Sequence, residues 1–274
     1  MKGIQKINHI AGLGGNVPIS TIDLIAKRKR KEEGGGGGAV VPTTDEYSSF
    51  EDEGWETSTQ QGDVFQSLLD SDVIISLIGN STGRYIHFQR VNTNTEAIAP
   101  LMGCTDDHAY CEYIGEALDA SDCITLYYTG TRIRGCKYNV GAAGNFHTGP
   151  MTSKQMVGFC KTNSGMRFLA TDGKLYSTLD YLSFTQTNDL SSIIPSSVNW
   201  KSCAYNSTDN YLYVLDTGTN KLYTIDLDTN TKIGEITPTD TLKGIVYHKG
   251  RITYCLRVGL SALKTVVLKN SDDA

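Results

Sequence analysis

Long apolar runs are the first thing that this sequence lacks. No stretch reaches the roughly 18 consecutive apolar residues that mark a membrane-spanning helix. The N-terminus is basic but has no apolar run of a secretory signal peptide behind it. Long patterns of helical periodicity are also scarce. We therefore expect a chain made in the cytoplasm, without membrane contact, and built mainly from strands.

The sequence also lacks the spacings that bind metals or run redox chemistry. There is no Cys-x-x-Cys pair, and the histidines do not fall at zinc-ligand spacing. The nearest approach is Cys104, His108 and Cys111, which have no fourth ligand nearby. The 7 cysteines are scattered over strand-like segments, so we expect all of them to be reduced thiols. No metal and no cofactor is expected.

What the sequence does contain is a repeated pattern of strands and turns. In Tyr211–Ile236, alternating aromatic and branched residues are interrupted by Asp216-Thr-Gly-Thr-Asn220 and Asp228-Thr-Asn-Thr231. These interruptions are rich in turn-forming residues. A further strand-like segment, Lys201–Tyr205, precedes them. Together they predict four antiparallel strands in about 40 residues.

The same unit recurs along the chain, which predicts an all-β protein. A single four-stranded sheet has two apolar faces and needs copies of itself on both sides. The predicted second strands begin near residues 73, 124, 167, 211 and 251. Spacings of about 40 residues are typical of propeller blades. In this pattern the chain resembles five-bladed β-propeller repeat proteins, with an extended N-terminal tail.

The first 64 residues differ from the rest. We expect a docking peptide with a short helix over residues 1–33, a glycine hinge and acidic linker over 34–64, and the propeller over 65–270. About 20 residues with few large apolar side chains cannot fold alone, so the peptide should gain order against another protein chain. The expected docking residues are apolar side chains and the basic block: Ile7, Ile10, Leu13, Val17, Ile19, Ile22, Ile25, Lys27, Arg28, Lys29, Arg30 and Lys31.

The basic block has several interpretations. It can be solvated surface, a nuclear address, a nucleic-acid contact or a docking site for an acidic partner. The formal net charge of −5 argues against a nucleic-acid-binding surface over the whole chain.

The last blade lacks a fourth strand near the C-terminus. After Leu263–Lys269 the chain ends, which would leave an open sheet edge. We predict that part of the linker, Gly54–Thr59, pairs antiparallel with this last strand and closes the ring, with Trp55 packed at the seam.

Patterns that suggest catalysis have simpler explanations. Val214–Thr219 matches an aspartic-protease triplet, but it occurs once and fits a turn between strands. Asp226–Asn230 begins like a calcium loop, but it lacks the required Gly and Glu at the later positions. The chain resembles five-bladed glycosidases in blade number, yet only Glu112 and Glu116 would point near the axis. We therefore expect no enzyme, and hydrolysis is the weakest alternative.

A non-enzymatic binding role remains. Five-bladed lectins are similar in composition, but the turns here differ from blade to blade and no Trp recurs at one offset. In organisation, an anchor-like peptide followed by a β-rich body resembles virion components of tailed bacteriophages, which implies a structural protein of a head, collar or tail. Host-surface or glycan contact by the propeller face, and a cytosolic scaffold, are the alternatives that the sequence leaves open.

Overall fold

Strands and turns make up the part of the protein that this computed structural model describes, and no helix occurs among those residues. Correspondingly, no helix there could span a lipid bilayer. All described residues belong to one compact unit, Val40–Ala274. The described residues are 41–47, 50–52, 60–66, 71–79, 85–95, 97–105, 113–114, 122–128, 133–139, 155–162, 165–178, 183–258 and 262–273.

The most regular sheet has a ten-residue period. Its strands pair in the order β14-β15-β16-β17, and four-residue turns join them. Each turn ends in an asparagine with positive φ, a conformation that Asn tolerates better than most residues: Asn210 (58°), Asn220 (55°) and Asn230 (54°). The strands are β14 (Lys201–Asn206), β15 (Tyr211–Asp216), β16 (Lys221–Asp226) and β17 (Thr231–Ile236).

Short polar side chains at the strand ends hold these turns. Asn206 Oδ1 accepts a hydrogen bond from the backbone N–H of Thr208 (2.9 Å), and Asp216 Oδ1 accepts one from Gly218 (3.0 Å). The protease-like triplet is therefore a turn, as predicted. Asp226 Oδ1 accepts from Asp228 (2.8 Å), so the calcium-like segment is a turn as well.

The remaining sheets repeat the antiparallel meander. One contains β3 (Gln60–Gln66), β4 (Val73–Gly79), β5 (Tyr85–Asn92) and β6 (Ala97–Thr105). The next contains β7 (Tyr113–Ile114), β8 (Asp122–Tyr128) and β9 (Ile133–Asn139). Another contains β10 (Met156–Thr162), β11 (Gly165–Ala170), β12 (Lys174–Thr178) and β13 (Thr185–Asp189). The last contains β18 (Val246–His248), β19 (Arg251–Val258) and β20 (Ala262–Asn270).

Contacts between neighbouring sheets form a closed cycle within this unit. β3 contacts β7, β9 contacts β10, β10 contacts β14, and β14 contacts β18. β18 and β19 then contact β3, which brings the last sheet against the first. Successive antiparallel sheets that contact each other in a cycle, here mostly through their first strands, make a β-propeller. The described residues form five such sheets, and a blade number of five stays a prediction because parts of the β7–β9 sheet lie outside them.

Two apolar clusters fill the spaces between sheets. One joins the β10–β13 and β14–β17 sheets through residues such as Leu169, Leu175, Leu212 and Ile225. The second joins the first sheet to the last through Val64, Ile74, Val91, Val246, Cys255 and Leu263. Burying one such side chain contributes about 1.5–3 kcal/mol. The contact between first and last sheets thus has its own apolar core.

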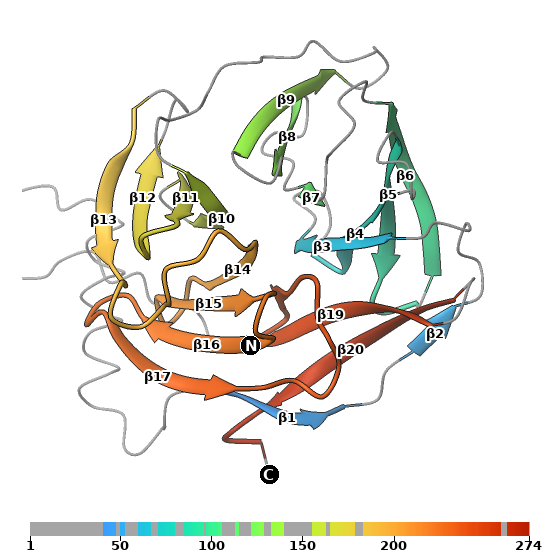
Figure 1. Cartoon of the computed structure of the whole chain (residues 1–274). Helices are drawn as coiled ribbons and strands as arrows, with labels where there is room; N and C mark the ends of the chain where they lie inside the picture. Colours follow the sequence, from blue (N-terminus) through green and yellow to red (C-terminus); the bar gives the residue numbers. More distant parts are fainter. Residues whose placement is uncertain are drawn as a thin grey trace, which may run out of the picture. The chain divides into compact units, whose positions relative to one another are not determined.

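Two short strands from the N-terminal side complete the last sheet. β1 (Pro42–Glu46) and β2 (Phe50–Asp52) both pair antiparallel with β20, and we call these two strands the N-terminal clasp (Figure 1, blue beside red). The backbone pairs include Pro42 with Asn270 and Phe50 with Thr265. Proline is tolerated in this position because it begins an edge strand.

The clasp corrects the sequence prediction of the closing strand. Pairing with β20 involves Pro42–Asp52 rather than Gly54–Thr59, and residues 53–59, including Trp55, lie outside the described residues. Strand-like alternation favoured the wrong segment, because pairing depends on partners more than 200 positions away. Cys160, Cys203 and Cys255 are free thiols, and the expectation that all seven cysteines are reduced stays a prediction.

Side chains also fasten the clasp. The buried Tyr254 hydroxyl lies 2.8 Å from Glu46 Oε1, to which it donates a hydrogen bond. Val41 occupies space that Gly234 of β17 leaves open, since a Cβ there would lie 2.2 Å from Val41 Cγ1. Tyr47 follows β1, and Arg251 (5.3 Å) and Lys269 (5.5 Å) lie over its ring. The clasp therefore contacts both the last sheet and the sheet before it.

Candidate functional site

The first strands of four sheets surround a small cavity. It has a volume of about 80 Å³ and is lined by residues of β3, β10, β14 and β18, with Ile245 just before β18. Propellers place their first strands around a central channel, so this is where a ligand would meet several sheets at once. The lining residues are Val64, Gln66, Phe159, Cys160, Lys161, Cys203, Ala204, Tyr205, Ile245, Val246 and Tyr247.

Glycine explains how closely two of these strands approach. A Cβ at Gly158 of β10 would lie 2.3 Å from the backbone oxygen of Lys201 and 3.0 Å from Cys203 Sγ, both on β14. Only a residue without a side chain fits against that backbone. The half-exposed residues of the lining alternate with buried neighbours, which leaves Gln66, Lys161, Tyr205 and Tyr247 as its accessible polar groups.

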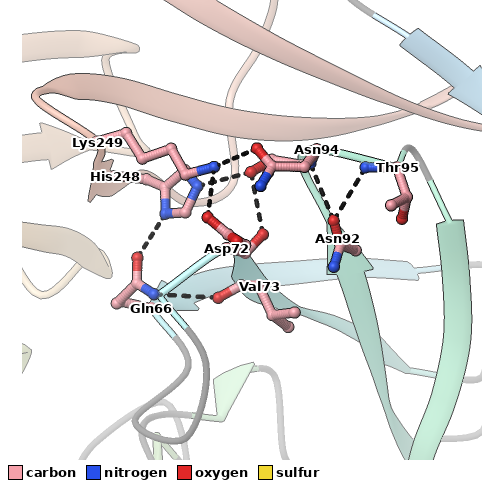
Figure 2. Close-up of polar contacts among 9 residues, drawn as sticks. Gln66, Asp72, Val73, Asn92, Asn94, Thr95, His248 and Lys249 are labelled. Carbon is pink, nitrogen blue, oxygen red and sulfur yellow. Dashed lines mark hydrogen bonds and ion pairs between the residues drawn. The ribbon is translucent and has the colours of Figure 1, made fainter.

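A buried histidine next to the cavity joins the first and last sheets. His248 at the end of β18 is 4% exposed. Its Nδ1 lies 2.5 Å from Gln66 Oε1 on β3, and its Nε2 lies 2.8 Å from the Thr93 hydroxyl after β5. Gln66 Nε2 donates to the backbone oxygen of Val73, 3.1 Å away, so its Oε1 faces the histidine as an acceptor (Figure 2). Nδ1 therefore carries the proton in the neutral ring.

Burial keeps this imidazole neutral. Desolvation lowers the pKa of His248 from 6.5 to about 4; the nearby Lys249 charge adds to this, and Asp72 opposes it. The Thr93 hydroxyl is also 3.0 Å from the Asp72 backbone oxygen, so it has an alternative acceptor. In the neutral state it donates to Nε2, whereas in acid it would accept from Nε2 and donate to that carbonyl.

Charged and amide side chains continue this contact toward solvent. Lys249 Nζ lies 2.8 Å from Asp72 Oδ1 and donates to Asn94 Oδ1 at 2.6 Å. This ion pair lowers the pKa of Asp72. Asn92 Oδ1 accepts from the N–H groups of Asn94 (2.9 Å) and Thr95 (3.0 Å), which fixes the turn after β5 (Figure 2). We call His248, Gln66, Thr93, Lys249, Asp72 and Asn94 the seam cluster.

The chemistry of the cavity suits binding. No carboxylate occurs in its lining, so the pair of acids that glycoside hydrolysis needs is absent from the described lining residues. Within the part of the chain that the structure describes, no group of three or more His, Cys, Asp or Glu could hold a metal ion. Burial raises the pKa of the Tyr205 and Tyr247 hydroxyls, which keeps both protonated as hydrogen-bonding groups.

The sequence-predicted docking residues lie elsewhere. Residues 1–40, which include every predicted docking side chain from Ile7 to Lys31, lie outside the described residues. The same is true of Glu112 and Glu116, and of His108 and Cys111. Sequence reasoning missed the cavity residues and His248. Gln66, Lys161, Tyr205 and Tyr247 lie in β3, β10, β14 and β18, and only the fold shows that these first strands meet.

Comparisons with known proteins agree on the fold. No family model matches the sequence, and no curated protein matches it. Glutaminyl cyclase from Myxococcus xanthus has a similar structure, with a TM-score of 0.50 at 15% identity over 83% of this chain and 97% of the cyclase. The Cps50 (Swd1) β-propeller domain from Myceliophteria thermophila gives 0.47 at 8% identity over 77% and 84%. A chain of the mitotic checkpoint complex gives 0.44 at 12% identity over 78% and 75%. At these identities the likeness concerns the fold alone.

Proposed function

We propose that this chain is a non-enzymatic protein-binding platform whose propeller is attached to a partner by residues 1–33. The observation that carries the proposal is the position of the clasp. The last sheet is completed from Pro42 onward, and residues 1–39 belong to a separate unit of the chain. In this proposal, the basic and apolar side chains of residues 1–33 bind another chain.

The cavity supports the same proposal. It is far smaller than the roughly 300–1,000 Å³ of pockets for drug-sized ligands. Its lining has no acid pair, and Gln66, Tyr205 and Tyr247 contribute amide and hydroxyl groups to it. Such a surface is suited to contact with another protein. The finer assignment, a head, collar or tail protein of a bacteriophage virion, rests on the organisation of the sequence.

Cross-linking in the native source tests the docking function. We expect Lys27, Lys29 and Lys31 to cross-link to another protein, while lysines of the sheets, such as Lys174, cross-link mainly within the chain. A chain lacking residues 1–39 should keep its melting temperature and lose those cross-links. Retention of the same partner by the shortened chain would contradict the proposal. Co-sedimentation with virus particles tests the virion assignment separately.

The charge and apolar parts of the tail can be separated by substitution. One variant replaces the five basic residues of 27–31 by Gln, and another replaces Ile10, Ile22 and Ile25 by Asp. If the tail docks by its apolar face, the variant with three Asp substitutions should lose the partner. The variant with Gln at 27–31 should still bind, and its binding should depend less on salt concentration than that of the wild type. Equal retention of the partner by both variants would show that residues 1–33 are not the docking segment.

A further inference from the structure

The polar groups around the cavity divide into those that are already bonded and those that are not. The Gln66 amide is held by His248 and Val73, and the Tyr205 hydroxyl donates to Asn210 Oδ1 at 2.9 Å. In the part of the chain that the structure describes, no hydrogen bond or ion pair is made by the Lys161 ammonium or the Tyr247 hydroxyl. Two donors at one cavity are thus unused.

Lys161 is unusual among the lysines because of where it lies. It is only partly exposed, near the end of β10, and it is the one charged residue among those that line the cavity. An ammonium removed from water without a counter-charge costs free energy. Arg251, which is also partly buried, has an anionic partner in Asp273 at 2.6 Å. Lys161 lacks such a partner, so an external anion would supply it.

Tyr247 contributes a hydrogen-bond donor whose position is fixed. Its ring stacks on Tyr213, with centroids 5.5 Å apart and planes at 14°, so the ring is held in place. Burial raises the pKa of its hydroxyl, which therefore remains a donor at neutral pH. Lys161 comes from β10 and Tyr247 from β18, two strands that β14 separates. An acceptor group in the cavity would meet donors from two sheets.

We propose that this cavity is a carboxylate-binding site in which Lys161 supplies the positive charge and Tyr247 a hydrogen bond. A carboxylate has two acceptor oxygens and can use both donors at once. A volume of about 80 Å³ admits a group of a few heavy atoms. The group is either a small free carboxylate or the side-chain carboxylate of an Asp or Glu on another protein. This site is separate from the proposed docking by residues 1–33.

Titration of the full-length protein tests the site. The probes are sodium acetate in chloride-free buffer and two capped tripeptides, acetyl-Gly-Glu-Gly-amide and its Gln counterpart. The readout is the 13C-detected shift of the Lys161 ε-methylene, with the other lysines as internal references. We expect saturable shifts at Lys161, and none with the Gln peptide. Binding of acetate without the Glu peptide indicates a small free carboxylate, and tighter binding of the Glu peptide than of acetate indicates a protein side chain.

Matched variants separate the charge from packing. Lys161→Met keeps the length of the side chain and should weaken binding at least about tenfold, while Tyr247→Phe should weaken it by about threefold to tenfold. Lys174→Met, on β12 and away from the cavity, and Tyr205→Phe, whose hydroxyl is already bonded, should bind as the wild type does. Thermal melting confirms that each variant is folded. The proposal would be overturned if Lys161 showed no saturable shift. It would also be overturned if the wild type and Lys161→Met, both followed through the Tyr247 ring signals, bound the probes equally well.

Discussion

The β14–β17 sheet and the contact between the first and last sheets are stabilised in different ways. In the β14–β17 sheet, bonds such as Asp216 to Gly218 span two residues, and strands pair with their nearest neighbours in sequence. At the contact between the first and last sheets, which we call the seam, His248 bonds Gln66 across 182 positions; within the last sheet, Tyr254 bonds Glu46 of the clasp across 208. Hydrogen bonds between residues that are close in sequence can form within their own segment. Contacts between residues about 200 positions apart require the rest of the chain to fold between them first. The seam is therefore where the fold is most easily disrupted.

Removing the clasp should have the largest effect. A chain beginning at residue 53 loses β1 and β2, which exposes the edge of β20 and leaves Tyr254 without Glu46. We expect a large fall in melting temperature and aggregation through the open edge. A chain beginning at residue 40 keeps the clasp and serves as the control. If the two truncated chains melt at the same temperature by calorimetry, the clasp does not stabilise the last sheet.

A smaller but clear effect is expected at the close approach of β10 and β14. Gly158→Ala places a Cβ against the backbone oxygen of Lys201, which cannot rotate away. We expect a loss of about 1–3 kcal/mol in the free energy of unfolding. Gly234→Ala is the matched control, because there the new Cβ meets the side chain of Val41, which can move. Denaturant unfolding should show the larger loss for Gly158→Ala; the reverse order would contradict this account.

Acid should weaken the seam through His248. Its pKa is about 4 in the folded protein and about 6.5 when unfolded, so below pH 6.5 the unfolded chain binds a proton that the folded chain does not. Stability should fall as the pH drops from 6.5 to 4, by at most about 3 kcal/mol, and then change no further from this group. Burial is the main cause of the lowered pKa; the Lys249 charge adds to it and the Asp72 charge opposes it.

The variant His248→Gln isolates that contribution. It has no titrating ring, so its unfolding free energy should vary less than that of the wild type between pH 6.5 and 4. Unfolding in urea at a series of pH values measures the difference. An identical pH dependence in both proteins would show that His248 does not titrate as its surroundings imply. His87, which lies on β5, offers a comparison by the same substitution.

The smallest effect is expected on the exposed face of β17. Glu235 bonds both Lys221 and Lys232 at 2.6 Å, which lowers the pKa of its carboxyl to about 2. A lowered pKa stabilises the fold above the ordinary value of 4.5, and this contribution is lost as the pH falls through 2. Because all three side chains are solvated, Glu235→Gln should barely change the melting temperature at neutral pH. A change as large as that of Gly158→Ala would show that this ion-pair group is a structural requirement.

Sequence reasoning succeeded where the controlling signal is local. The predicted second strands near 73, 124, 167, 211 and 251 correspond to strands that begin at Val73, Asp122, Gly165, Tyr211 and Arg251. Turn residues bound these segments, and apolar alternation marks them, so no distant partner is needed to recognise them.

The seam shows what could not be predicted. Asp45 and Glu46 read as part of an acidic linker, yet they lie in β1, and Glu46 accepts a bond from Tyr254. His248 read as an isolated histidine, because Gln66 and Thr93 are far away in sequence. The hydrogen bonds that a polar residue in a strand makes depend on which residues the fold places opposite it. A single sequence does not show that pairing.

The clasp also sets the timing of folding during synthesis. β1 leaves the ribosome first, but its partner β20 is made more than 200 residues later. At about 5–20 residues per second, β1 waits for roughly 10–45 s. During that interval the earlier sheets can form, while the clasp strands remain without their partner. A chaperone that protects the clasp strands would act in this interval, before β1 pairs with β20.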